Sequence, residues 1–418
     1  MERIIAHYLI ETPYDLDKAT AILAGEQSSG TFVDIPGETQ ALKDRFSARV
    51  ENIELLEQAQ QPSLPGDSSP HASYKRARVS VSWSVENFQD NIPTLIATLQ
   101  GNLYELRQFT GLKLDDFDLP DYYKSKFKGP VFGAKATKEL AGVIPQKPMI
   151  GTIIKPSIGF TPQQTADLVK VLVEGGIDFI KDDELMASSA NSPFEERVCQ
   201  VMKVIKNHQQ KTGKKVMYAF NISGDLETMK RNYDVVVQHG GSCAMLSINS
   251  VGWVGVKAIA DLGGLSIHGH RNGWGMLNRH PLLGINFPAY AKLWRLAGVD
   301  QLHVNGIRNK FWESDASVIR SIKACSEPFL GIRKLLPVVS SGQWGAQAFD
   351  TYKHTKTTEL LYMAGGGIMS HPFGPAAGVR ALQQAWSGAV QGKTIEETEH
   401  ECAEFAALVA KFGKLKTS

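Results

Sequence analysis

A lysine stands beside three acidic residues in the segment FIKDDE, which ends at Glu184. If this segment is a β-strand, Lys181 and Asp183 share one face while Asp182 points to the other. Glu184 then comes at the strand end, where the backbone leaves the pleat. A simple salt bridge would explain the pattern, but so would a site for Mg²⁺, which prefers oxygen ligands and retains several waters. The neutral amine of Lys181 would add an oxygen ligand if it captured CO2 as a carbamate.

Two glycine-bearing segments are candidates for binding phosphate, because glycine lets backbone N–H groups approach the oxygens of an anion. The first segment, SSGQ, contains Ser340 and Gly342, and the second, AGGG, contains Gly366 and Gly367. A tight turn explains an isolated glycine triplet equally well. The presence of both segments makes a phosphate site the stronger interpretation.

A basic segment, HGHR, ends in His270 and Arg271. Together with His303, it could hold a second anion through charge-assisted hydrogen bonds.

All these residues lie at the ends of short β-rich runs. Gaps of roughly 20 to 37 residues between runs leave room for a loop and a helix each time. Eight such units in about 270 residues are typical of a (β/α)8 barrel, whose functional residues collect at the carboxyl ends of the strands. A doubly wound open sheet is the alternative, but no G-x-G-x-x-G follows the first run. The eight runs are centred near residues 152, 180, 217, 245, 266, 302, 338 and 361.

The first third of the chain predicts a smaller α+β domain. Alternating segments at 7–12 and 77–83 predict strands, and the stretches at about 37–60 and 87–100 predict helices. The expected fold is therefore α/β, with a C-terminal TIM barrel after an N-terminal α+β domain of ferredoxin-like type. We place these domains at residues 1–135 and 136–418.

The composition indicates a globular protein and disfavours several other classes. The chain has 418 residues, of which 43% are hydrophobic and 21% are charged, as expected of a globular protein with a large core. A net charge of +2 gives no field that would recruit nucleic acid or an anionic membrane. The four cysteines are scattered without a C-x-x-C pair, which disfavours a disulfide scaffold or a cysteine-based zinc site. A cytoplasmic enzyme is expected.

Several motifs together resemble the large subunit of ribulose bisphosphate carboxylase, with the same order and spacing over about residues 5–390. In the barrel these are GTIIKPSIG, GGIDFIKDDE, IHGHR, the loop from His303 to Lys310, SSG and AGGG. In the N-terminal part they are GEQSSGTF at 25–32 and GN at 101–102.

The resemblance implies a metal centre and acid–base groups around it. Lys181 would be the carbamylated lysine, and Asp183 and Glu184 would be the other Mg²⁺ ligands. Three further residues would act in catalysis: Lys155 as the acid/base near the enolising carbon, His270 in proton transfer, and Lys310 as the mobile-loop lysine that cradles CO2 in carboxylases.

The resemblance also implies two phosphate pockets, one formed by Arg271, His303 and Ser340 and the other by Thr31, Gly342, Gly366 and Gly367. In the family, the N-terminal domain of one subunit caps the barrel of its partner. A homodimer is therefore expected, with no small subunit, no nucleic acid and no membrane as partner. The residues acting in trans would be Glu26, Thr31 and Asn102.

Departures from the family pattern indicate a RuBisCO-like protein that does not fix carbon. The KPK motif of carboxylases is Lys155-Pro156-Ser157 here, and a histidine that follows the HxHR motif is replaced by Trp274. The lysine lost from KPK tunes the base and helps protonate the carboxylated product. The mobile loop is more basic than in carboxylases and gains Arg308.

The favoured function is Mg²⁺-dependent decarboxylation of a phosphorylated β-keto sugar acid through a metal-stabilised enediolate. The departing carboxylate needs a cation, and Lys310 with Arg308 suits that role. The alternatives are a diketo-methylthiopentane-phosphate enolase and another RuBisCO-like isomerase or transcarboxylase. A non-catalytic ligand-binding barrel would be expected to lose the metal ligands, which are all present. The sequence leaves the side group of the substrate open.

Overall fold

The computed structural model describes residues 2–29, 35–66, 72–88, 90–186 and 188–413. The chain forms two compact units. The first comprises Met1–Lys128, Gly273–Leu296 and Pro328–Ile332, and the second comprises Gly129–Asn272, Ala297–Glu327 and Arg333–Ser418. Among the described residues, no helix has both the length and the apolar character needed to cross a membrane.

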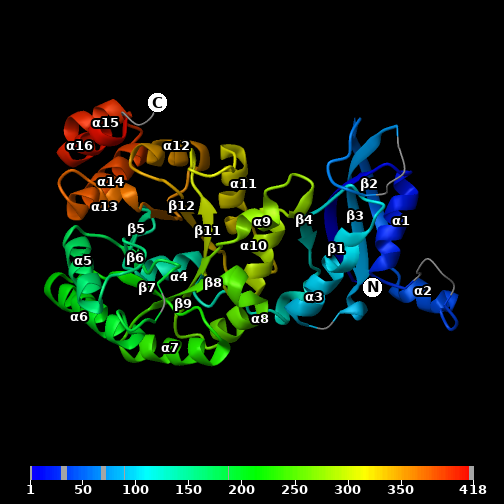
Figure 1. The fold of residues 1–418 in the computed structure, drawn as a ribbon, viewed down its shortest axis with the longest axis horizontal. Coiled ribbons are helices and arrows are strands. Elements are labelled where there is room, and N and C mark those ends of the chain that lie inside the picture. The colour runs from blue at the N-terminus through cyan, green and yellow to red at the C-terminus, as the bar shows by residue number, and fades with distance from the viewer. Residues whose placement is uncertain (1, 30–34, 67–71, 89, 187, 414–418) are drawn as a thin grey trace. The chain divides into compact units, whose positions relative to one another are not determined.

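The second unit is built on a closed barrel of parallel strands in the order β11-β12-β13-β5-β6-β7-β8-β9 (Figure 1). Every run that the sequence predicted to be a barrel strand is one, so the predicted TIM barrel is confirmed. The strands are β5 (Met149–Ile153), β6 (Phe179–Lys181), β7 (Met217–Asn221), β8 (Cys243–Ser247), β9 (Ser266–His270), β11 (Gln301–Asn305), β12 (Leu336–Ser340) and β13 (Leu361–Met363).

Helices follow the strands and surround the barrel in Figure 1. A capping box at Thr161 and Gln164 begins α5, which ends at Gly175. Apolar side chains from several strands, Met149, Phe179 and Met245 among them, form one buried cluster. The helices of this unit are α4 (Gly133–Leu140), α5 (Pro162–Glu174), α6 (Phe194–Thr212), α7 (Leu226–Gln238), α8 (Ile248–Ala260), α11 (Asp315–Ser326), α12 (Ala346–Thr355), α13 (Gly366–Met369), α14 (Pro375–Val390), α15 (Ile395–Glu401) and α16 (Ala403–Phe412).

The first unit contains a mixed sheet in the order β10-β4-β1-β3-β2, so the predicted α+β domain is confirmed. Its strands pair antiparallel except for β10, which runs parallel to β4. The strands are β1 (Arg3–Thr12), β2 (Arg49–Ala59), β3 (Tyr74–Ser84), β4 (Gly111–Asp118) and β10 (Leu283–Ile285). The helices are α1 (Leu16–Glu26), α2 (Gln40–Phe46), α3 (Ile92–Leu99), α9 (Trp274–Asn278) and α10 (Phe287–Leu296), with 3-10 turns η1 (Val85–Asn87), η2 (Gly101–Glu105) and η3 (Asp121–Ser125).

The expectation of a helix over about 37–60 is wrong in its second half. Only α2 is helical there, and residues 49–59 form the edge strand β2. The segment is rich in Glu, Leu and Gln, which favour helices, but tertiary pairing overrides that preference. Cross-strand ion pairs from β3 hold it, with Arg76 2.6 Å from Glu57 and Arg78 2.9 Å from Glu54.

Asp182 anchors the end of β6 from inside the protein. One carboxylate oxygen accepts a hydrogen bond from Tyr218 Oη at 2.6 Å, and the other accepts from the Asn221 N–H at 2.9 Å. The guanidinium of Arg197 lies 3.4 Å from the same carboxylate, and both charged side chains are fully buried. Asp182 therefore has a structural role, on the opposite side of the strand from Asp183, as the period of two predicts.

We predict that Asp182→Ala lowers the free energy of unfolding by about 3 kcal/mol, because it leaves the Arg197 charge buried without its partner. Urea denaturation followed by circular dichroism measures this change. Asp261→Ala is the matched control, since it breaks an exposed pair with Lys257, and its cost should stay below about 0.5 kcal/mol. Equal stability of the two variants would contradict the structural role of Asp182.

Candidate active site

Lys181, at the end of β6, is an almost completely buried charged group of the predicted metal centre. Its side chain is only 2% exposed, and its Nζ lies 3.4 Å from Glu184 Oε2. The same Nζ donates to the carbonyl of Asp182 at 2.9 Å and faces Met245 Sδ at 3.5 Å. The structure thus brings the amine and the Glu184 carboxylate together at the carboxyl end of the strand.

The surroundings of Lys181 suit capture of CO2. Burial lowers the pKa of Lys181, and the nearby Glu184 and Asp183 carboxylates oppose this shift. A lowered pKa increases the fraction of neutral amine, which is the form that reacts with CO2. Among the described residues, no group of three or more His, Cys, Asp or Glu side chains is arranged to hold a metal. The two carboxylates beside this lysine fit a magnesium centre, in which a carbamate on Lys181 would supply a third ligand.

Lys155, which follows β5, contacts the Asp183 carboxylate of the same cluster. Its Nζ donates to Asp183 Oδ2 at 2.6 Å and to Ser157 Oγ at 2.7 Å. Asp183 is 1% exposed at its side chain, whereas Lys155 is 44% exposed, so the lysine remains open to a ligand. The other oxygen of Asp183 accepts from the Leu185 N–H at 3.0 Å, which fixes the carboxylate.

Histidines of β9 and β11 line the next part of the rim. His270 Nε2 lies 3.5 Å from Glu184 Oε2. Burial is the main cause that lowers the pKa of His270 to about 3, and the neighbouring charge of Lys181 adds to it. Burial also holds the pKa values of His268 and His303 well below their usual range. All three side chains are therefore neutral at pH 7.

The neutral histidines form a directed chain of hydrogen bonds. Gln301 Oε1 accepts from His268 Nδ1 at 3.0 Å, while Gln301 Nε2 donates to Ser266. His268 Nε2 is then left to accept from His303 Nε2 at 2.9 Å. His303 Nδ1 in turn faces Ser340 Oγ at 3.1 Å, so the chain joins two predicted binding residues.

Arg271, directly after β9, forms a buried ion pair with Glu313. The two atoms Arg271 Nη2 and Glu313 Oε2 are 3.1 Å apart, and the side chains are 6% and 1% exposed. Asn305 Nδ2 donates to the same carboxylate at 2.5 Å, and Ser317 Oγ donates to it at 2.8 Å. Glu313 and Asn305 were not predicted from the sequence, because an isolated polar residue has no diagnostic spacing.

Of the glycines of the predicted phosphate pocket, Gly342 lies in the loop after β12, and Gly366 and Gly367 begin α13, which follows β13. Gly342 has φ of 79°, a left-handed conformation that favours glycine. A Cβ at Gly366 would meet open space within 4 Å, whereas one at Gly367 would come 2.8 Å from the Gln343 carbonyl oxygen. Gly367 thus permits close backbone packing, and Gly366 leaves its backbone approachable.

Lys310 lies in the loop after β11. Its backbone N–H donates to the Ser341 carbonyl at 3.2 Å, which holds the loop against the turn after β12. Its exposed ammonium lies 5.2 Å from the ring centroid of Phe311. Arg308 pairs with Asp350 of α12. This carboxylate partly neutralises the positive charge that Arg308 was predicted to add beside Lys310.

The first unit carries the predicted residues Glu26 and Asn102. Glu26 is the last residue of α1, and Asn102 lies in η2. The two segments meet at Gln27, since a Cβ at Gly101 would lie 2.1 Å from the end of the Gln27 side chain. Thr31 lies outside the described residues.

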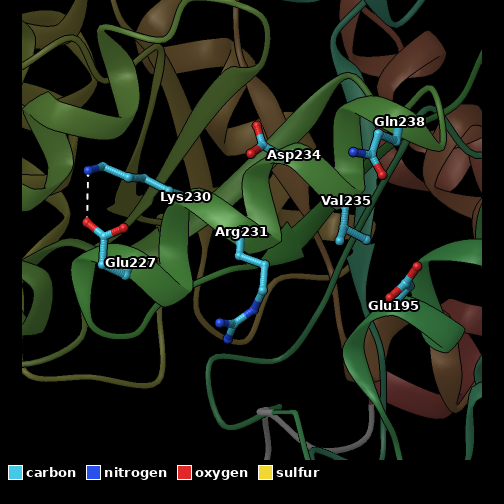
Figure 2. Close-up of a pocket in the computed structure, with 7 residues that line it drawn as sticks. All are labelled: Glu195, Glu227, Lys230, Arg231, Asp234, Val235 and Gln238. Atoms are coloured by element: carbon cyan, nitrogen blue, oxygen red, sulfur yellow. Dashed lines mark hydrogen bonds and ion pairs between the residues drawn. The ribbon is translucent and has the colours of Figure 1, made fainter.

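A hollow on the outside of the barrel is unrelated to these residues. Figure 2 shows its lining, which comes from α7 and from Glu195 of α6. Lys230 and Glu227 form a surface ion pair at 2.9 Å there. No strand-end residue takes part, so the barrel rim remains the candidate site.

Comparison with known proteins gives the same family over nearly the whole chain. The sequence model described as "Ribulose bisphosphate carboxylase large chain, catalytic domain" matches residues 138–412, and that of the N-terminal domain matches residues 1–123.

Three relatives illustrate the similarity. A 3-oxo-isoapionate-4-phosphate transcarboxylase/hydrolase of Xanthobacter autotrophicus is 50% identical, with 95% of this chain and 96% of that protein covered. A 3-oxo-isoapionate-4-phosphate decarboxylase of Rhizobium rhizogenes is 46% identical, with 97% of each chain covered. The crystal structure of a RuBisCO-like protein from Burkholderia fungorum is 42% identical and superposes with a TM-score of 0.91, covering 98% of this chain and 100% of that one.

We predict that the metal-free protein loses stability in acid because of its three buried histidines. Unfolding restores their usual pKa near 6.5, so the unfolded chain binds protons that the folded chain excludes. The free energy of unfolding is therefore not reduced by this effect above pH 6.5. Below pH 6.5 it falls by about 1 kcal/mol per histidine for each pH unit. Urea unfolding in EDTA at pH 7 and pH 5.5 measures the loss.

Two variants test the origin of this pH dependence. His303→Gln should remove about one third of it, since one of three histidines no longer titrates. His354→Gln, at an exposed position of α12, should leave it unchanged. An unaltered pH dependence in His303→Gln would contradict the assignment.

Proposed function

This chain belongs to the ribulose bisphosphate carboxylase large-chain family, and we propose that it decarboxylates 3-oxo-isoapionate 4-phosphate to CO2 and a tetrulose phosphate. The observation that carries the proposal is the cluster of Lys181, Asp183 and Glu184 at one strand end, with Lys155 bonded to it. The names of the relatives supply the substrate. Carbon fixation is not proposed, because Ser157 replaces the second lysine of KPK.

Mg²⁺ would be held by Asp183, Glu184 and a carbamate on Lys181. When bound, the metal would offset the negative charge that develops on the substrate oxygens next to the breaking bond.

Lys155 is the proposed proton donor. When the bond to the carboxylate carbon breaks, the electron pair stays on the sugar carbon and CO2 leaves. That carbon then needs a proton, and Lys155 carries one close to Asp183. Its partial exposure at the barrel rim leaves a third N–H free to face the substrate. Neutral His270, beside Glu184, would assist the proton transfer.

Binding residues complete the proposed site. Lys310 would hold the departing carboxylate. Arg271, His303 and Ser340 would contact one end of the substrate, and Thr31, Gly342, Gly366 and Gly367 would contact the other. A homodimer is proposed, in which Glu26 and Asn102 of one subunit complete the site of its partner. The segments that carry Glu26 and Asn102 are in contact at Gln27, which supports the proposal that the two residues act on the same site.

A transcarboxylase/hydrolase is the second candidate, because the relative with that name is 50% identical. Such an enzyme would retain the carboxyl carbon and add water to the carboxylated product. We favour simple decarboxylation because Ser157 offers no charge to help protonate that product. The two functions differ in the fate of one carbon atom.

We predict that substrate labelled with 13C in the carboxyl group, incubated with Mg²⁺, releases its label as CO2 in a one-to-one ratio with substrate consumed. NMR follows the label. Retention of the label in a phosphorylated acid would contradict decarboxylation and favour the transcarboxylase.

Lys181→Ala should reduce turnover and Mg²⁺ affinity together, each by more than about 100-fold, because it removes a metal ligand. It should also abolish the 13C carbamate signal that the unaltered protein gives with labelled bicarbonate. The matched control, Lys170→Ala on the exposed face of α5, should retain all three properties. A fully active Lys181→Ala variant would refute the carbamate.

Lys310→Met should slow CO2 release by at least about tenfold, because it removes a charge-assisted contact to the departing carboxylate. The aliphatic stem is kept, so packing against Gly342 is preserved. Solvent deuterium exchange into the product should change less than CO2 release. Equal losses in both measurements would show that Lys310 has no special role toward the carboxylate.

A further inference from the structure

A buried carboxylate already pairs with Arg271 of one predicted phosphate pocket. Glu313 accepts from Arg271 at 3.1 Å, from Asn305 at 2.5 Å and from Ser317 at 2.8 Å. These donors come from the ends of β9 and β11 and from α11. Both oxygens of Glu313 are therefore satisfied at the strand ends where the second phosphate of a bisphosphate would be expected.

The charge of this cluster is balanced. The positive charge of Arg271 is compensated by Glu313, and both side chains are almost completely buried. Neither His268 nor His303 adds charge, since burial keeps both neutral at pH 7. A phosphate dianion placed here would face the Glu313 carboxylate at short range in a poorly solvated setting, where repulsion is strong.

We propose that Glu313 sets substrate specificity by making the pocket of Arg271, His303 and Ser340 select an uncharged, hydroxylated end of the substrate over a phosphate. The hydroxyl of Ser340 and the imidazole of His303 remain suitable partners for sugar hydroxyls. This inference rests on the proposed function and deepens it. The substrate then carries a single phosphate, which is bound by the loop that contains Gly342 and by Gly366 and Gly367 at the start of α13.

The Glu313 carboxylate is held in place by its neighbours. Glu313 is anchored by Asn305, which is itself fixed by Ser341 Oγ at 2.7 Å. The carboxylate is thus part of a rigid network and not a mobile surface group. Accepting a second phosphate would require expelling Glu313 from this network.

Binding of two unreactive polyols tests the proposal without turnover. Xylitol 5-phosphate and xylitol 1,5-bisphosphate are compared by isothermal titration calorimetry with Mg²⁺ present. The unaltered protein should bind the bisphosphate no more than about threefold tighter than the monophosphate. Glu313→Gln should bind the bisphosphate at least about tenfold tighter than the unaltered protein does, with little change for the monophosphate.

Ser317→Ala is the control for general disturbance, since it breaks one contact to Glu313 but keeps the charge. It should retain the binding of both polyols. A large preference of the unaltered protein for the bisphosphate would overturn the proposal, and this comparison remains valid even if Glu313→Gln does not fold. An unchanged bisphosphate affinity in folded Glu313→Gln would also overturn it.

Polyol binding and CO2 release, measured together, distinguish an error in the role of Glu313 from an error in the proposed decarboxylation. Tight bisphosphate binding together with normal CO2 release from the sugar acid would refute only the role of Glu313. Absence of binding of either polyol would refute both, because no phosphate pocket would remain. Selective monophosphate binding without CO2 release would support the role of Glu313 while contradicting decarboxylation.

Discussion

The burial of the Lys181 amine is the constraint that determines the chemistry of the barrel rim. Removing an ammonium from water costs several kcal/mol unless close anions compensate it. Here the compensation is partial, because the nearest carboxylate oxygen of Glu184 is 3.4 Å away and a carbonyl and a thioether provide the other contacts. The neutral amine is therefore favoured relative to an exposed lysine. A neutral amine is a nucleophile toward CO2. Burial of Lys181 therefore increases its reactivity toward CO2.

The alternation of a β-strand divides the neighbouring acids of β6 between two tasks. Asp182 faces the helix layer, where its two oxygens contact Tyr218, the backbone N–H of Asn221 and Arg197 of α6. Asp183 faces the rim and meets Lys155. A one-residue shift of register would exchange these partners and leave a buried arginine without its carboxylate. The internal network around Asp182 thus fixes the register that presents Lys181 and Asp183 to the rim.

Most of the fold and part of the candidate site could be predicted from the sequence, for a common physical reason. Barrel strands are short apolar runs with polar residues at their ends, so both the strand and its rim residue appear locally in the sequence. The edge strand β2 was missed because its stability comes from partners on β3, such as Arg76, and not from its own residues. Glu313 was missed for the same reason. Its place in the site depends on its pairing with Arg271, which lies 42 residues away in the chain. Long-range electrostatic partners leave no periodic pattern.

The hydrogen bonds of Lys155 favour decarboxylation over enolisation as the first chemical step. Its Nζ donates to Asp183 and to Ser157, and both contacts use N–H groups. The Asp183 carboxylate accepts the first of these bonds at 2.6 Å, which holds the amine in place. An enolase would require Lys155 to begin as a neutral base that removes a proton from carbon. A β-keto acid that loses CO2 instead generates an electron pair that must be protonated, and an N–H donor held in place serves that need directly. The serine that replaces the second lysine of KPK therefore supports this role, because it orients the donor without adding a competing charge.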